Sequence, residues 1–196
     1  IGDGEAIAAM EEIGAASMPN GFAYEWTGMA SEVKSSAGQA GIVLGFALLF
    51  AYLFLVALYE SWNVPVGVML SVVAAVMVAI FGVWVAGSSV DVYVQIGIVV
   101  LIALAAKNAI LIVEFALLRL GEGKSIEEAA VLGAQERFRP VMMTSFAFIA
   151  GLVPLVTASG PGADSMFAVG VPVFAGMIGS AVIGVILIPL LFIVFE

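Results

Sequence analysis

Five apolar stretches dominate this sequence, and each is long enough to cross a lipid bilayer as a helix. They cover residues 41–59, 64–86, 92–118, 140–158 and 166–195. A helical span needs about 20 predominantly apolar residues. Of the 196 residues, 63% are hydrophobic and only 11% are charged, which is not the composition of a soluble domain of this length. The sequence therefore predicts an all-α membrane bundle of five transmembrane helices over residues 39–196.

The basic residues predict how the bundle is oriented in the membrane. Four of the six lie between the third and fourth stretches: Arg119, Lys124, Arg137 and Arg139. Short loops rich in Lys and Arg stay on the cytoplasmic side of a membrane. We therefore expect this loop to be cytoplasmic, and residues 1–38 and 158–165 to lie on the opposite side.

The cytoplasmic loop is expected to contain a short helix of its own. Ser125 and Glu128 form a capping-box pattern, which predicts a helix over about residues 126–136. Pro140 follows, and we place it in the first turn of the next span, where its missing N–H group is tolerated.

The last stretch, 166–195, is too long for one straight crossing. We expect this stretch either to tilt or to begin with an irregular turn near Gly170 and Pro172, because both residue types disturb regular helices. Small residues spaced four apart allow helices to approach closely in lipid. They occur in the first and last stretches, at Gly41, Gly45, Gly176, Ser180 and Gly184.

Residues 1–38 differ in character from the rest. Apolar residues at helical spacing (Ile7, Met10 and Ile13) predict a helix, and the alternation over Phe22–Thr27 predicts a strand. One helix and one edge strand cannot form a core. We interpret this segment as a short α/β piece of an extracytoplasmic domain, and the sequence as part of a longer chain.

Lys107 is the residue that most needs an explanation. It lies near the middle of the stretch 92–118, where a charged side chain costs roughly 2.5–3.5 kcal/mol on insertion scales. Glu114 follows seven residues later, about 10 Å along a helix, and we expect it near the interface, either solvated or paired with an arginine of the loop. No carboxylate of the five stretches matches the depth of Lys107. We infer that its counter-ion comes from another domain or chain.

Composition also excludes several classes of protein. The sequence has no cysteine and no histidine, and its net charge is −9. We therefore expect no nucleic-acid partner, no cofactor and no metal site. An intramembrane enzyme would need paired aspartates, a Ser/His pair or a zinc motif within its spans, whereas Ser145 and Ser180 have no base. We predict that the protein is not an enzyme.

Several motifs resemble the C-terminal part of the resistance-nodulation-division exporters, most closely the drug and amphiphile exporters of Gram-negative bacteria. They are "WTGM" (26–29), "ALYESWNVPVGVML" (57–70), "DVYVQIG" (91–97), "AAKNAILIVEFA" (105–116), "GKSIEEAA" (123–130) and "RFRPVMMTSFAFIAGLVPL" (137–155). The resemblance implies a proton-driven drug antiporter whose much longer chain has two similar halves. Residues 1–38 would belong to a periplasmic porter domain of the second half.

The resemblance also implies a proton relay within the membrane. A lysine at the position of Lys107 contacts a pair of aspartates on a helix of the other half. Thr144 and Arg137 match residues that assist this relay, and we include Asn108, the neighbour of Lys107.

The implied setting is the inner membrane of a Gram-negative bacterium, with the N-terminal half of the transporter, lipid and small amphiphilic substrates as partners. A homotrimer, a periplasmic adaptor and an outer-membrane channel are implied as well. Two alternatives remain open: an exporter of metal ions or lipids from the same superfamily, and a structural or assembly fragment without transport activity.

Overall fold

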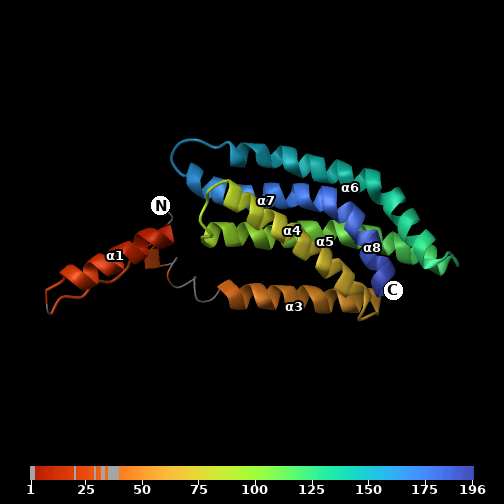
Figure 1. Cartoon of the computed structure of the whole chain (residues 1–196), viewed down its shortest axis with the longest axis horizontal. Helices are drawn as coiled ribbons and strands as arrows, with labels where there is room; N and C mark the ends of the chain where they lie inside the picture. Colours follow the sequence, from red (N-terminus) through yellow and green to blue (C-terminus); the bar gives the residue numbers. More distant parts are fainter. Residues whose placement is uncertain (1–2, 20, 29, 32–33, 35–39) are drawn as a thin grey trace.

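The computed structural model describes residues 3–19, 21–28, 30–31, 34 and 40–196, and all regular structure in these ranges is helical (Figure 1). In chain order the elements are α1 (Asp3–Ser17), α3 (Ala40–Tyr59), α4 (Val64–Val85), α5 (Val92–Gly121), α6 (Ile126–Val156), α7 (Ala163–Gly179), the π-helical turn η1 (Ser180–Gly184) and α8 (Val185–Phe195).

Four helical segments are long and apolar enough to cross a membrane. They are Val64–Val85, Val92–Gly121, Ile126–Val156 and the combined run Ala163–Phe195. This confirms the prediction of an apolar helical bundle. The first predicted span corresponds to α3, which is apolar along its length, but only its shorter part Leu44–Tyr59 is recognised as an apolar helix. A fifth span therefore stays a prediction.

Helices α3, α5, α6 and α7 run roughly along one common axis, and α4 and α8 cross them obliquely (Figure 1). The α3–α4 connection, the α5–α6 turn and the C-terminus lie at one end of the bundle, and the α4–α5 and α6–α7 connections lie at the other. Helices α5 and α6 are antiparallel neighbours, so residues early in α6 face residues late in α5. The turn between them places Ser125 at the N-cap of α6, where its hydroxyl accepts a hydrogen bond from the Glu128 N–H, as the capping pattern predicted.

The prediction of two helices on either side of Pro140 is wrong. A single helix, α6, runs from Ile126 to Val156 and contains Pro140 in its interior. Proline removes one backbone hydrogen bond and bends a helix without having to end it, and Figure 1 shows α6 curving in its N-terminal half. The buried residue Gly133 packs so closely on the backbone of Ala116 that the N-terminal half of α6 stays against α5.

The predicted irregular turn near Gly170 and Pro172 is also misplaced. Helix α7 passes through both residues, and the irregularity is η1, eight residues further on. Gly170 and Pro172 are buried at helix contacts, where Pro172 meets Gly97 of α5. Neighbouring helices of a membrane bundle can hold a proline-containing segment in helical form.

Small residues set the closest helix contacts. A Cβ atom added at Gly176 would lie 2.1 Å from Cδ2 of Leu101, and one added at Gly97 would lie 2.7 Å from Cγ of Pro172. Helix α7 therefore packs directly on α5, as the spacing of small residues predicts for Gly176. Gly41 and Gly45 of α3, in contrast, have no atom of the described residues within 4 Å of an added Cβ.

The N-terminal segment is a helix followed by irregular chain. Helix α1 confirms the predicted helix, but Phe22–Thr27 forms no strand, since no second strand among the described residues pairs with it. Glu11 of α1 instead accepts hydrogen bonds from Trp26 and Lys34. The contacts with Lys34 and then Trp26 lower the pKa of the partly buried Glu11 carboxyl, and the contact with Glu11 raises the pKa of the exposed Lys34.

Candidate functional site

Lys107 points out of the bundle at mid-length of α5. Its side chain is exposed, and its ammonium group lies 5.6 Å from the centroid of the Phe148 ring on α6. A cation over an aromatic face is stabilised by roughly 0.5–2 kcal/mol, which is less than the cost of its charge in lipid. Among the described residues, no carboxylate forms an ion pair with Lys107.

Asn108, the next residue, points into the bundle and is only 2% exposed. Its Nδ2 atom donates hydrogen bonds to Oγ of Ser145 at 3.2 Å and to Oγ of Ser180 at 3.4 Å. Ser145 lies on α6 and Ser180 is the first residue of η1. We call Asn108, Ser145 and Ser180 the polar knot. Its hydrogen bonds connect α5, α6 and η1 within a largely apolar interior.

Thr144 precedes Ser145 and therefore lies at the depth of Asn108 and Lys107. It is partly buried, and its hydroxyl donates to the Val141 carbonyl oxygen at 3.1 Å within α6. Phe148, the ring beside Lys107, is one turn further along the same face of α6. The structure thus brings Lys107, Asn108 and Thr144 to one level of the α5–α6 pair.

Arg137 lies apart from these three residues. It precedes Thr144 by seven positions, which is about 10 Å along α6. Its guanidinium Cζ lies 3.5 Å from the centroid of the Phe115 ring, and its buried Nε atom has no hydrogen-bond partner among the described residues. Arg137 therefore holds the seam between α5 and α6 and does not reach Lys107 in this structure.

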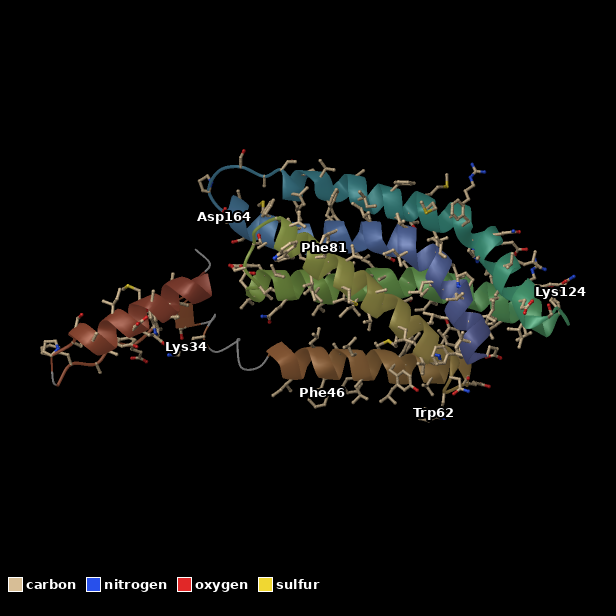
Figure 2. The ribbon with its side chains drawn as sticks, viewed as in Figure 1. Lys34, Phe46, Trp62, Phe81, Lys124 and Asp164 are labelled. Atoms are coloured by element: carbon tan, nitrogen blue, oxygen red, sulfur yellow. The ribbon has the colours of Figure 1, made fainter. Side chains whose placement is uncertain are left out.

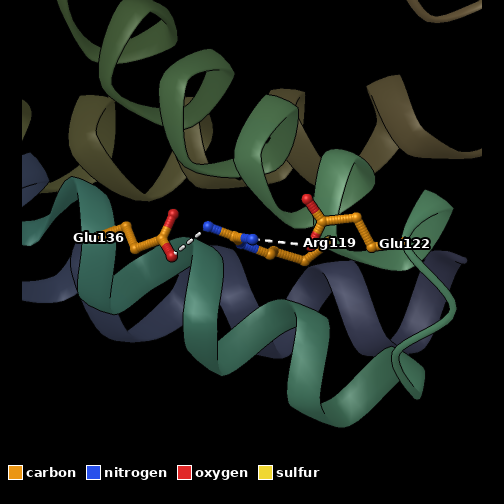
Figure 3. Close-up of polar contacts among 3 residues, drawn as sticks. All are labelled: Arg119, Glu122 and Glu136. Atoms are coloured by element: carbon orange, nitrogen blue, oxygen red, sulfur yellow. Dashed lines mark hydrogen bonds and ion pairs between the residues drawn. The ribbon is translucent and has the colours of Figure 1, made fainter.

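The end of this seam is fixed by ion pairs. Arg119, in the last turn of α5, binds Glu122 through Nη1 and Glu136 of α6 through Nη2, each at 2.6 Å (Figure 3). Glu114, by comparison, is exposed and forms no ion pair within the described ranges, so the predicted pairing with an arginine of the loop does not occur here.

Ser145 and Ser180 are the residues that sequence reasoning passed over. The sequence provides no base for either serine as a nucleophile, and in the structure both accept hydrogen bonds from Asn108. A buried asparagine among apolar residues needs hydrogen-bond partners at its own depth. This requirement is the feature of the sequence that could have pointed to the two serines. In the part of the chain that the structure describes, no group of three acidic, histidine or cysteine side chains could hold a metal ion.

Comparison with known proteins agrees with the motifs. The sequence profile of the AcrB/AcrD/AcrF family matches residues 2–196. The chain is 45% identical over 190 residues to the toluene efflux pump membrane transporter TtgB of Pseudomonas putida, covering 97% of this chain and 18% of that protein. It is 40% identical over 194 residues to the multidrug export protein AcrF of Escherichia coli, covering 98% of this chain and 19% of that protein.

A third relative, the multidrug resistance protein MdtF of Escherichia coli, is 42% identical over 194 residues, again 98% of this chain and 19% of the relative. The chain thus spans about a fifth of the length of the relatives it matches. The match to the family profile covers nearly all of the chain, and the apolar helical bundle fits a membrane transporter. The chain belongs to the AcrB/AcrD/AcrF family of resistance-nodulation-division efflux transporters.

Proposed function

We propose that this chain is the lysine-bearing part of a proton-driven exporter of small amphiphilic compounds. The observation that carries the proposal is Lys107, a cation at mid-length of an apolar helix with no ion-pair partner in the described part of the chain. An exposed ammonium group in lipid is unfavourable by several kcal/mol. Its partner therefore belongs to the remaining four fifths of the transporter.

The partner is a pair of aspartates on a helix of the N-terminal half. When both are ionised, Lys107 balances their charge and lowers their pKa values. Protonation of one aspartate weakens this attraction and frees the ammonium group to pair differently. The face of α6 that carries Thr144 and Phe148 lies beside Lys107, where it can guide such a movement.

Arg137 takes a different part in this proposal. Its position about two turns away from Thr144, with its guanidinium group on the Phe115 ring, places it between the lysine level and the α5–α6 turn. We assign it to the path by which protons leave toward that end of the bundle. Protons then travel between water and the aspartates, which are the groups that bind and release them.

The setting follows the same proposal. The chain crosses the inner membrane of a Gram-negative bacterium five times, with α3 as the first span and the α5–α6 turn in the cytoplasm. Residues 1–38 belong to a periplasmic porter domain. The full transporter works as a homotrimer with a periplasmic adaptor and an outer-membrane channel. Three of its relatives carry efflux, export or multidrug resistance in their names.

Replacement of Lys107 in the full-length transporter tests the proposal. Lys107→Ala leaves the aspartates as uncompensated like charges, so proton-driven export from reconstituted vesicles should fall roughly a hundredfold or more. Lys107→Arg should also fail, because a planar guanidinium group that stays protonated cannot replace a compact ammonium group.

The matched control is Lys34→Ala, which removes an exposed lysine that pairs with Glu11 outside the bundle. It should export normally at equal protein amounts. Normal export by a folded Lys107→Ala transporter would reject the relay and leave Lys107 with a structural role only.

A further inference from the structure

Asn108 occupies a special place on α5. The buried residues of this helix form a stripe that faces the rest of the bundle, and Asn108 is its single polar member: Val94, Gly97, Ile98, Leu101, Ala105, Asn108, Ala109, Ile112, Val113 and Ala116. Apolar contacts have no preferred direction, so they allow a helix to rotate by small amounts at little cost. A hydrogen-bonded side chain in the same stripe opposes such a rotation, because a hydrogen bond weakens when its geometry changes.

The two hydrogen bonds of Asn108 are directional and divergent. A side-chain amide nitrogen has two hydrogens, and here one points to Ser145 on α6 and the other to Ser180 on η1. All three side chains are at most 5% exposed, so water cannot replace a lost partner. Rotation of α5 about its axis would break at least one of these bonds.

The rotation of α5 decides where Lys107 points. Successive residues of an α-helix are about 100° apart, so the direction of Asn108 into the bundle sets the direction of Lys107 out of it. The burial of the two side chains agrees with these directions, because Lys107 is exposed and Asn108 is buried. The contacts that fix the direction of the Asn108 side chain around the α5 axis therefore also fix the direction of the Lys107 ammonium group.

Ser180, the second hydrogen-bond acceptor of Asn108, lies in a π-helical segment. Ser180 is the first residue of the π-helical turn η1, and such turns within α-helices are frequently found at functional sites. Ser180 itself still follows α7, because its N–H bonds to the Gly176 carbonyl oxygen. The polar knot thus links the junction of α7 and η1 to the rotation of α5.

We propose that Asn108 is a positioning residue: its amide group, bound by Ser145 and Ser180, sets the rotation of α5 and thereby aims Lys107 at its partner outside this chain. The proposal deepens the proposed function, because the aim of Lys107 matters only if Lys107 works in a relay. Asn108 does not ionise and carries no proton itself.

A reporter at position 107 tests the geometry independently of transport. In a cysteine-free full-length transporter carrying Lys107→Cys, the rate of reaction with N-ethylmaleimide reports how this position is presented. Adding Asn108→Ala should change that rate by roughly threefold or more, the scale of one interhelical hydrogen bond in a membrane. A reporter created by Lys124→Cys, beyond the end of α5, should keep its rate.

Transport kinetics with Lys107 intact supply the second readout. Asn108→Ala should lower kcat for proton-driven export roughly threefold to twentyfold while KM for the exported compound stays the same. The double variant Ser145→Ala with Ser180→Ala should reproduce this loss, and adding Asn108→Ala to it should cost nothing more. Ser71→Ala is the matched control, since Ser71 is equally buried but bonds only to Val68 of its own helix.

The outcomes separate the two proposals. If Asn108→Ala leaves the labelling rate at position 107 unchanged, positioning is wrong even where Lys107→Ala abolishes export. If Lys107→Ala exports normally, the relay is wrong, and the labelling rate still decides whether Asn108 sets the rotation of α5. Should Asn108→Ala fail to fold, the serine double variant carries the same measurement, and an unchanged labelling rate in it overturns the proposal.

Discussion

At the scale of single residues, the approach of α7 to α5 depends on the missing side chain of Gly176. The Leu101 side chain is fully buried and fills the space that a Cβ atom at position 176 would need. Overpacking of such a site forces side chains out of their rotamers and shifts the backbone, which costs typically about 1–3 kcal/mol. The contact lies one turn before the polar knot, so it also helps to bring Ser180 to Asn108.

Gly176→Ala should therefore destabilise the protein by about 1–3 kcal/mol, because the new methyl group meets Leu101. Thermal unfolding of the full-length transporter in detergent measures the effect. Gly184→Ala is the control in the same helical run. There the new Cβ would come no closer than 3.6 Å to Ser180 and 3.8 Å to Ile188, so no loss of stability is expected. Equal melting temperatures for the two variants would contradict this account of the contact.

Individual site residues were predictable to different degrees. Lys107 stands out in the sequence, because a charge in an apolar stretch is costly wherever the helix packs. The roles given to Thr144 and Arg137 came from the resemblance to known exporters and stay predictions. The partnership of Asn108 with Ser145 and Ser180 could not be predicted, because it depends on how α5 is aligned against α6 and against the end of α7.

At the scale of elements, the apolar stretches located the helices but not their interruptions. Proline removes one backbone hydrogen bond locally, whereas continuation of the helix depends on neighbouring helices that a sequence does not show. Gly133 lies against Ala116, and Arg119 binds Glu136, so the segment before Pro140 is held along α5 and stays in helix. The irregular turn η1 contains no proline, and its Ser180 and Gly184 are residue types that also occur at the contacts of regular membrane helices, so residues 180–184 did not predict it.

At the scale of the whole molecule, much of the apolar surface has no cover from this chain. On α3, Phe46, Phe50 and Phe54 recur every four residues on the outer face and are more than half exposed, and Figure 2 shows Phe46 pointing away from the other helices. Met10 and Ile13 of α1 are likewise exposed. Lipid and the remaining four fifths of the transporter are expected to cover these surfaces.

The orientation of the molecule leads to a labelling prediction. Because basic loops remain in the cytoplasm, a cysteine introduced by Lys124→Cys in the α5–α6 turn should react with an impermeant reagent only from the cytoplasmic side. A cysteine introduced by Ser89→Cys in the α4–α5 connection should react only from the periplasmic side. Both positions are exposed, and this part of the chain has no native cysteine. Reaction of both from one side would contradict the predicted topology.

The protonation of the intramembrane acids tests the central claim most directly. Infrared spectroscopy of the full-length transporter follows the carbonyl band of protonated carboxylic acids as the pH is raised. Removing the cation in Lys107→Ala takes away the attraction that favours the ionised acids, so their titration midpoint should move to higher pH by about one unit or more. Lys34→Ala should leave the midpoint unchanged. An unshifted midpoint in folded Lys107→Ala protein would show that Lys107 does not balance those acids.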